Sequence, residues 1–498
     1  MSTEAAAAMS RNGIMGHPRG LLTLSTTEMW ERFSYYGMRA LLVLFMVEAV
    51  DEGGLGYSDQ TATAIYGLYT AAVYVIALPG GWIADRLIGG QRAVWYGGII
   101  IMCGHFILAI PTVWAFFTGL AFVAVGTGLL KPNISAIVGE FYPPGDPRRD
   151  GGFTIFYMGI NVGAALGPLV CGFLAQENWH YGFAVAGFGM LFGLIQFRVT
   201  QDHLGDAGRL PPARRENDAA FERKAWGFIS ASLLAVAFVM AAALNGVLTI
   251  DAVALAQAST YIIAGLGALY FVYLFTFGNL TTDERDRVIV LIVLFIACAI
   301  FWSGFEQAGS SLNLFADRYT IREFGDFTIP PTWFQSLNPV FIIVLAPFYS
   351  MIWISLARRN LDPSSPLKFA IGLIILGLGF AIMIGAATLV AEGQQVLPTW
   401  LFFTYLLHTM GELALSPVGL SAVTKLSPRR YVGQLMGVWW LATSLGNILA
   451  GLLAGEFRAD AVEEMPGLYT QIVITTVGAG ILLALVSKPL KRLTRGVE

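Results

Sequence analysis

Long apolar segments, each separated from the next by a short polar turn, run through nearly the whole chain. Because a helix needs about 20 mostly apolar residues to cross the core of a bilayer, this pattern predicts a polytopic α-helical membrane protein. A polar stretch rich in Pro, Gly and charge, residues 201–224, is typical of an exposed loop and separates six spans from eight. The fourteen predicted spans are 21–49, 62–85, 92–111, 113–138, 153–175, 181–199, 225–246, 258–278, 288–309, 333–356, 367–390, 398–423, 432–455 and 467–487.

The composition agrees with a membrane location and limits the possible partners. Of the 498 residues, 56% are hydrophobic and 13% are charged, which is about half the charged fraction of a soluble domain. A net charge of −3 gives no basic excess for phosphates, so we expect no nucleic-acid partner. Cys103, Cys171 and Cys298 lie far apart in apolar runs, without the spacing of a metal site or a disulfide. We therefore expect no metal and no cofactor.

The basic residues indicate which loops face the cytoplasm. Lys and Arg accumulate in short cytoplasmic loops, and 24 of the 30 Lys and Arg residues fall on one side when both termini are placed there. This predicts a multi-pass protein of the cell (inner) membrane with both termini in the cytoplasm. The exceptions are Arg318, Arg322 and Arg458 on the opposite side, and Arg32, Arg39 and Lys131 within spans.

The order of the spans predicts two six-helix halves and an inserted helical pair, as in transporters that are built from related repeats. The apolar runs of the inserted pair contain no charge, so we expect a peripheral hairpin that faces lipid. The predicted boundaries are a cytoplasmic tail 1–20, a first bundle 21–200, a cytoplasmic loop 201–224, the hairpin 225–278, a second bundle 288–487 and a tail 488–498.

The first span carries a polar stripe. Each charge inside a span costs about 2.5 to 3.5 kcal/mol, so such charges are kept mainly where they face a cavity or a partner. Four residues of the stripe are ionisable, and mutual neutralisation at i and i+4 explains only Glu28 and Arg32. The stripe is better explained as the lining of a water-filled path, where two neighbouring carboxylates provide a transferable proton. It consists of Glu28, Glu31, Arg32, Tyr35 and Arg39, at i, i+3, i+4, i+7 and i+11.

Three more charges, Lys131, Glu306 and Glu412, lie in the spans 113–138, 288–309 and 398–423. All the cations within spans come from the first half of the chain, whereas the anions Glu306 and Glu412 come from the second half. A cavity between the halves would therefore be bipolar, and it would suit a zwitterion such as a short peptide through charge-assisted bonds at both ends. Amino acids and other zwitterions fit this pattern too.

Polar and aromatic side chains near these charges have two interpretations. Asn161 and Asn338 could hydrogen-bond a substrate or a neighbouring helix. The aromatic residues could form adaptable pockets, or they could pack and lie in the lipid belt. They include Tyr35, Tyr74, Trp302 and Trp439.

The segment GGWIADRLIGGQR (80–92) places Asp85 and Arg86 at the cytoplasmic end of the second span. It resembles the loop motif that the major facilitator superfamily carries between its second and third helices. In that superfamily the motif latches the halves together, so the resemblance implies a gating role for both residues.

Several segments, in order along the chain, resemble the proton-coupled oligopeptide transporter family of the major facilitator superfamily, in its bacterial form. EMWERFSYYG (28–37) matches that family's ExxERFxYYG signature residue for residue. The resemblance covers nearly the whole chain, and bacterial members also have the extra helical pair. Further similar blocks are GGWIADR, LLKPNIS, FYMGINVGAALGP, FWSGFEQ, WFQSLNPVFI, GELALSPVGLS and MGVWWLATSLGN.

The resemblance implies a major facilitator fold and a symporter, not an enzyme, that imports di- and tripeptides with protons by alternating access. Its partners would be the peptide, protons as co-substrate and the bilayer, and the protein would act as a monomer. Glu306 would pair with Arg39 and release it on protonation. The other implied roles are proton coupling by Glu28, Glu31 and Arg32 with Lys131, binding of the peptide carboxylate by Arg39 and Lys131, binding of the amino terminus by Glu412, Asn161 and Asn338, and pockets shaped by Tyr35, Tyr74, Trp302 and Trp439.

One departure and three alternatives remain. In some relatives a histidine of the second span senses protons. This chain has no histidine in or near that span, so carboxylates must carry the proton coupling. A carrier of nitrate or another small anion could share the fold, although Glu412 would not help an anion. A passive channel would not need so many titratable pairs. A membrane enzyme has no support from a nucleophile elbow or a phosphate loop.

Overall fold

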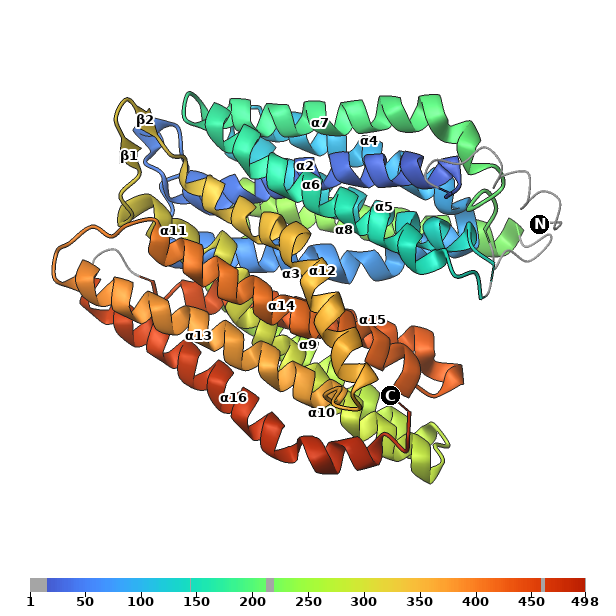
Figure 1. The fold of residues 1–498 in the computed structure, drawn as a ribbon. Coiled ribbons are helices and arrows are strands. Elements are labelled where there is room, and N and C mark those ends of the chain that lie inside the picture. The colour runs from blue at the N-terminus through green and yellow to red at the C-terminus, as the bar shows by residue number, and fades with distance from the viewer. Residues whose placement is uncertain (1–15, 144, 212–218, 458–461, 498) are drawn as a thin grey trace. The chain divides into compact units, whose positions relative to one another are not determined.

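The computed structural model describes residues 16–143, 145–211, 219–457 and 462–497, which are mostly helical (Figure 1). Residues 1–15 of the predicted N-terminal tail, 212–218 of the predicted loop, Arg458 and residue 498 lie outside the described residues. The long helices are α2 (Arg19–Val47), α3 (Asp59–Ile83), α4 (Gly90–Leu108), α5 (Val113–Glu140), α6 (Arg149–Ala175), α7 (Trp179–Thr200), α8 (Ala219–Leu244), α9 (Ala252–Phe277), α10 (Thr282–Phe305), α12 (Leu337–Arg358), α13 (Ser365–Ala391), α14 (Thr399–Leu426), α15 (Val432–Ala454) and α16 (Met465–Leu493).

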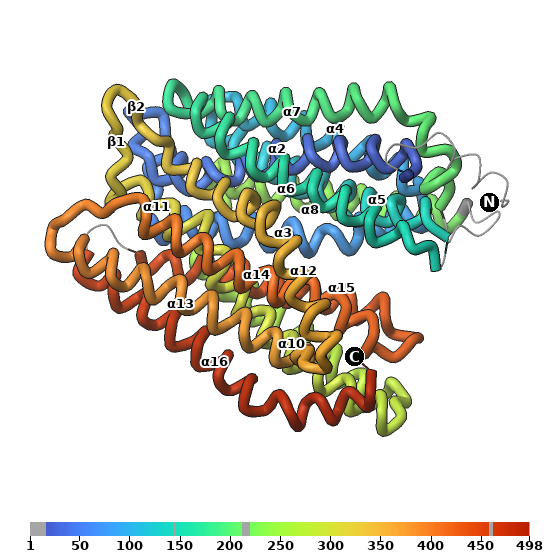
Figure 2. The backbone as a smooth tube through the Cα atoms, viewed as in Figure 1, coloured from blue at the N-terminus to red at the C-terminus, as the bar shows by residue number. Residues whose placement is uncertain are grey.

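Shorter elements connect or extend these helices. The strands β1 and β2 pair antiparallel in the loop between α11 and α12, where Figures 1 and 2 label them. The short elements are α11 (Ser311–Arg318), β1 (Glu323–Phe324), β2 (Phe327–Thr328), the π turn η2 (Ala84–Ile88), and the 3-10 turns η1 (Val50–Glu52), η3 (Gln201–Leu204), η4 (Glu306–Gly309), η5 (Pro331–Ser336), η6 (Arg429–Tyr431) and η7 (Val462–Glu464).

Eleven helices of the described chain are long and apolar enough to cross a membrane. One of them is the interrupted helix formed by α10, η4 and α11. α2, α4 and α14 do not meet that criterion, and α2 carries the polar stripe predicted from the sequence. Each of the fourteen predicted spans overlaps one of these fourteen helices. The prediction of an all-α polytopic membrane protein is therefore confirmed.

Contacts divide the chain into two compact units that share α2 and α3. Unit 1 contains the described residues up to 38 together with 76–255, and unit 2 contains 39–75 together with those from 256 on. The last third of α2 and the first two thirds of α3 thus pack with unit 2. The hairpin is divided as well, because α8 is assigned to unit 1 and nearly all of α9 to unit 2. The boundaries of the two bundles stay a prediction.

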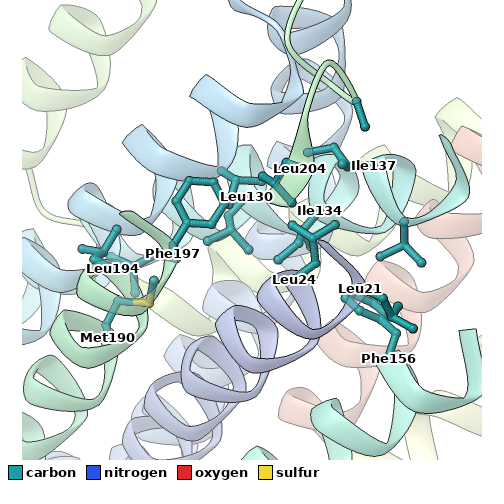
Figure 3. Close-up of a cluster of buried hydrophobic side chains, with 14 of the residues drawn as sticks. Leu21, Leu24, Leu130, Ile134, Ile137, Phe156, Met190, Leu194, Phe197 and Leu204 are labelled. Atoms are coloured by element: carbon teal, nitrogen blue, oxygen red, sulfur yellow. The ribbon is translucent and has the colours of Figure 1, made fainter. Parts of the chain in front are cut away.

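Unit 1 is held together by close packing of α4, α5 and α7 with the first part of α2. A buried cluster joins these helices, with Leu21 of α2, Ile134 of α5 and Phe197 of α7 among its members (Figure 3). Gly97 and Gly126 let α4 and α5 approach, since a Cβ on Gly97 would lie 2.8 Å from the Gly126 carbonyl oxygen. Small residues at such crossings give helices in lipid the van der Waals contact that drives their association.

Unit 2 contains two groups of packed helices. α13 lies beside both α14 and α16, while α10 packs against α15 (Figure 1). α10 begins with a capping box, in which Thr281 accepts from the amide of Glu284 and Glu284 accepts from the amide of Thr281. This start fixes the connection between α9 and α10.

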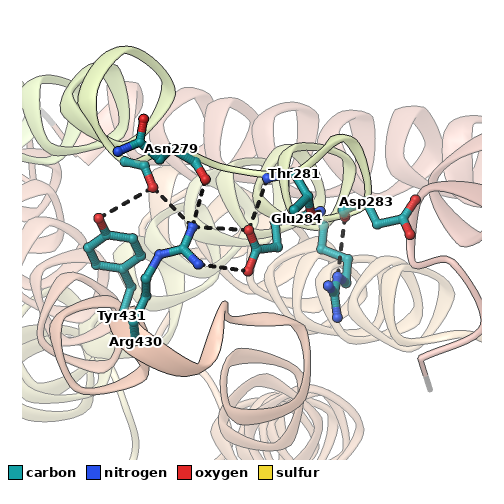
Figure 4. A network of polar contacts seen from close by, with 8 residues as sticks. Asn279, Thr281, Asp283, Glu284, Arg430 and Tyr431 are labelled. Atoms are coloured by element: carbon teal, nitrogen blue, oxygen red, sulfur yellow. Dashed lines mark hydrogen bonds and ion pairs between the residues drawn. The ribbon is translucent and has the colours of Figure 1, made fainter.

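A polar network surrounds that connection (Figure 4). Arg430, in the turn between α14 and α15, donates to the carbonyls of Gly278 and Asn279 at 3.0 and 2.9 Å and pairs with Glu284 at 3.1 Å. Tyr431 donates to the Gly278 carbonyl at 3.4 Å. The connection from α9 to α10 therefore holds the turn between α14 and α15 in place.

Candidate functional site

The stripe on α2 forms a compact group of buried charges in unit 1. The spacing i, i+3, i+4 puts Glu28, Glu31 and Arg32 on one face of the helix. The Arg32 guanidinium lies 2.7 Å from a Glu28 oxygen and 3.2 Å from a Glu31 oxygen, and all three side chains are buried. Thr127 of α5 donates to Glu31 at 3.5 Å, and Lys131, one turn further along α5, interacts electrostatically with Glu31. Four predicted residues from two helices are thus brought together.

Arg39 lies further along the same helix but belongs to unit 2. Its guanidinium lies 3.0 Å from the Glu306 carboxylate, and both side chains are buried. Glu306 begins η4, where the helix formed by α10 and α11 is interrupted. Gln307 fixes the interruption, because its amide donates to the carbonyls of Ser303 and Ala450 at 3.2 and 3.1 Å. The Arg39–Glu306 ion pair therefore lies at a break in a membrane-spanning helix.

A second acidic group in unit 2 joins α12 and α14. Asn338 is the second residue of α12, and its amide nitrogen donates to Glu412 at 2.9 Å and to the Thr409 hydroxyl at 3.0 Å. Glu306 and Glu412 interact electrostatically. The structure thus places Arg39, Glu306, Asn338 and Glu412 in one unit, with Thr409 as a member that the sequence did not single out.

The predicted aromatic residues lie in both units. Tyr35 is buried in unit 1, where its ring contacts that of Tyr36. In unit 2, Tyr74 stacks on Trp440 with ring centroids 5.9 Å apart. The other two pack against phenylalanines: Trp302 contacts Phe305 at 5.2 Å, and Trp439 contacts Phe369 at 6.0 Å.

Asn161, Asp85 and Arg86 belong to unit 1. The Asn161 amide donates to the Tyr157 carbonyl one turn earlier in α6, at 2.9 Å. Asp85 and Arg86 lie in η2 with exposed side chains, and neither forms an ion pair or hydrogen bond within the described residues. The same described ranges contain no group of three His, Cys, Asp or Glu side chains that could hold a metal ion.

Sequence reasoning missed a bidentate ion pair in unit 2. Arg318 at the end of α11 makes a bidentate contact with Asp59 at the start of α3, at 2.7 and 2.8 Å. Such a fork-to-fork pair is among the strongest charge-assisted contacts. The available signal was that Arg318 is one of very few basic residues assigned to the side opposite the cytoplasm.

The fold and these groups define a polytopic helical membrane protein with acid–base pairs inside its helices. Comparison with known proteins identifies the class further, because the profile of the POT family matches residues 91–468. A peptide transporter of Yersinia enterocolitica is 43% identical over 97% of this chain and 96% of its own, and a di-/tripeptide transporter of Lactococcus lactis subsp. cremoris is 37% identical over 97% and 98%. A crystal structure of a POT peptide transporter in complex with sulfate is similar with a TM-score of 0.91, at 40% identity and full coverage of both chains. The protein belongs to the POT family.

Proposed function

We propose that this protein is a proton-coupled symporter that imports di- and tripeptides by alternating access. The observation that carries the proposal is the presence, in one unit, of a buried cation–anion pair, Arg39–Glu306, and of an acid–amide pair, Asn338–Glu412. A short peptide offers a carboxylate to a cation and an ammonium to an acid. The names of the relatives from Yersinia and Lactococcus agree with this substrate class.

The peptide termini are the groups that every di- and tripeptide shares, so binding through them suits a transporter of many sequences. Arg39 and Lys131 hold the carboxylate in this proposal, and Glu412 holds the amino terminus with Asn161 and Asn338. Charge-assisted bonds of this kind are strong when they are shielded from water. Tyr35, Tyr74, Trp302 and Trp439 shape the pockets for the peptide side chains.

Protons enter the cycle by competing for the same cations. Glu28 and Glu31 share one guanidinium, Arg32, so the three charges together are negative until a proton or Lys131 compensates. A proton on Glu31 releases Lys131, and a proton on Glu306 releases Arg39, so that both cations can bind a peptide carboxylate. Loss of the protons inside the cell restores the ion pairs and expels the peptide.

Two polar groups serve as gates in this proposal. Asp85 and Arg86 act at the cytoplasmic end of α3, and the Asp59–Arg318 pair acts at the other end of that helix. The positive-inside distribution supports a cell (inner) membrane location with both termini in the cytoplasm. We propose that one chain carries out the whole transport cycle and that the protein works as a monomer.

Uptake of labelled dialanine into proteoliposomes tests the function. With an inward proton gradient and a negative interior we expect accumulation above equilibrium, which an uncoupler abolishes, since an inward charge gains about 2.3 kcal/mol per 100 mV. Equilibration without accumulation would indicate a facilitator or channel. Uptake of nitrate in place of dialanine would indicate an anion carrier, for which the acid Glu412 gives no advantage.

A further inference from the structure

Three residues of α12 and α14 form a directed chain of hydrogen bonds. The Thr409 hydroxyl donates to the Tyr405 carbonyl at 2.7 Å, and its oxygen lies 3.0 Å from the amide nitrogen of Asn338. The same nitrogen lies 2.9 Å from Glu412 Oε2. Thr409 is fully buried, so its hydroxyl is enclosed by protein.

The chemistry of these groups allows only one direction along the chain. A hydroxyl has a single hydrogen, and in Thr409 that hydrogen goes to a carbonyl, which can only accept. The Thr409 oxygen must therefore accept from Asn338, and only the NH₂ end of the Asn338 amide can donate. The same NH₂ group supplies its second hydrogen to Glu412. Thr409 thus fixes which end of the amide faces α14, whatever the protonation state of Glu412.

The other end of the amide is left as an acceptor. Asn338 Oδ1 accepts no hydrogen bond within the described residues. This oxygen is not completely enclosed by protein, unlike the buried polar atoms elsewhere in the described chain that have no partner. Because the amide is planar, Oδ1 points away from Thr409. An ammonium group can then be bound by two acceptors, this carbonyl oxygen and the Glu412 oxygen that Asn338 does not use.

We infer that Thr409 is a positioning residue for the amino terminus of the substrate, which it does not touch: it holds the Asn338 amide with its carbonyl oxygen available to the ammonium group. This inference rests on the proposed function and extends it to a residue outside the binding contacts. Without the hydroxyl, the amide can rotate and present NH₂ donors to a cation. Loss of the Thr409 hydroxyl therefore weakens binding of the ammonium group and leaves the later steps of transport unchanged.

Uptake kinetics in proteoliposomes test the inference with three variants. Thr409→Val keeps the shape and removes the hydroxyl, and Thr409→Ser restores the hydroxyl. Thr476→Val makes the same change at a buried threonine of α16, whose hydroxyl bonds, among the residues that the structure describes, only to carbonyls of its own helix. For Thr409→Val we expect KM for dialanine to rise about five- to tenfold, the value of about one hydrogen bond, with Vmax within about twofold. The serine variant and Thr476→Val should stay within about twofold of the unmodified protein in both parameters.

A competitor without an ammonium group separates positioning from general damage. N-acetyl-dialanine should inhibit Thr409→Val and the unmodified protein with the same Ki, whereas the Ki of dialanine rises with its KM. Equal changes for both compounds, or a serine variant that behaves like the valine variant, would overturn the inference while leaving peptide transport established. Absence of dialanine uptake by the unmodified protein would overturn the proposed function and this inference with it.

Discussion

At the scale of single residues, the chemistry of the site depends on which cation pairs with which carboxylate. Arg32 contacts Glu28 and Glu31 together, and Lys131 interacts with Glu31 from the neighbouring helix α5. Replacing one carboxylate with a neutral side chain therefore changes which cation is held in an ion pair and which is available to bind a peptide carboxylate. Burial makes the effect large, because a charge that loses its partner away from water costs several kcal/mol.

Glu31→Gln is the most direct change to the proton-coupling group. A glutamine cannot exchange a proton, so Lys131 stays released at every pH and the driving force is lost. Under 100 mV the unmodified protein should accumulate dialanine up to about 50-fold for one coupled charge, and the variant should only reach equilibrium while still exchanging peptide across the membrane. Glu177→Gln, at an exposed carboxylate between α6 and α7, is the matched control and should accumulate normally. Retained accumulation in Glu31→Gln would exclude Glu31 from coupling.

Glu48, just beyond the end of α2, gives a prediction about pH. Burial and a hydrogen bond with Glu52 raise the pKa of Glu48 above its ordinary value. The folded protein then binds this proton more tightly than the unfolded chain, so the stabilising contribution is complete below the ordinary pKa and is lost as pH rises through the raised one. Glu48→Gln removes this dependence. Its thermal unfolding midpoint in detergent, relative to that of the unmodified protein, should therefore increase as pH rises through and above the ordinary range of a glutamate side chain.

The control for that series is Asp51→Asn, at an exposed carboxylate of the adjacent turn that forms no ion pair or hydrogen bond in the described part of the chain. It should follow the unmodified protein at every pH. Parallel curves for Glu48→Gln and the unmodified protein would contradict a raised pKa at Glu48.

At the scale of elements, the contacts around the connection from α9 to α10 explain how the inserted hairpin is attached to unit 2. α8 is almost entirely exposed along its apolar run, and α9 is mostly so. The contacts near the end of α9 include polar ones, since Tyr270 donates to Gln434 of α15 at 2.9 Å and Arg430 binds the carbonyls that follow α9 (Figure 4). The arrangement ties α9 to the turn between α14 and α15.

Arg430→Ala should therefore loosen that turn. Partly exposed ion pairs contribute about 0.2 to 1 kcal/mol, and the two carbonyl bonds add to this, so we expect the unfolding midpoint in detergent to fall by about 1–2 °C. Arg429→Ala, at the neighbouring exposed arginine without such contacts in the described chain, should leave the midpoint unchanged. Equal midpoints for the two variants would mean that the network in Figure 4 contributes nothing to stability.

The sequence predicted those elements and groups that depend on local periodicity. All fourteen long helices were predicted because a helix needs about twenty mostly apolar residues to cross lipid, and eleven of them in the described chain meet that criterion. The stripe of α2 was found because i, i+3 and i+4 lie on one helix face. The break at η4, the bidentate pair of Asp59 with Arg318 and the role of Thr409 were missed. Each depends on contacts between segments far apart in the chain, such as the contact of Gln307 with Ala450, and a single sequence does not reveal these contacts.

At the scale of the whole molecule, the distribution of charge among the loops determines how the chain is inserted. The turn between α6 and α7 contains Glu177 and no Lys or Arg, whereas Arg358 and Arg359 lie at the end of α12. The positive-inside rule predicts that the first turn faces the exterior and that the second faces the cytoplasm. These two turns make the orientation testable with one reagent.

Glu177→Cys and Leu361→Cys place an exposed thiol in each turn. Cys171 and Cys298 are buried and Cys103 is partly buried, so the unmodified protein provides the background labelling. A membrane-impermeant maleimide should label Glu177→Cys in intact cells and Leu361→Cys only after the membrane is opened or inverted. Five spans, formed by α7, α8, α9, the helix that begins with α10, and α12, lie between residues 177 and 361, and an odd number of spans puts the two thiols on opposite sides of the membrane. The reverse pattern requires the whole chain to be inverted, and labelling of both variants in intact cells requires an even number of spans between the two residues. Either outcome would refute the assignment of both termini to the cytoplasm, and with it the direction of peptide import.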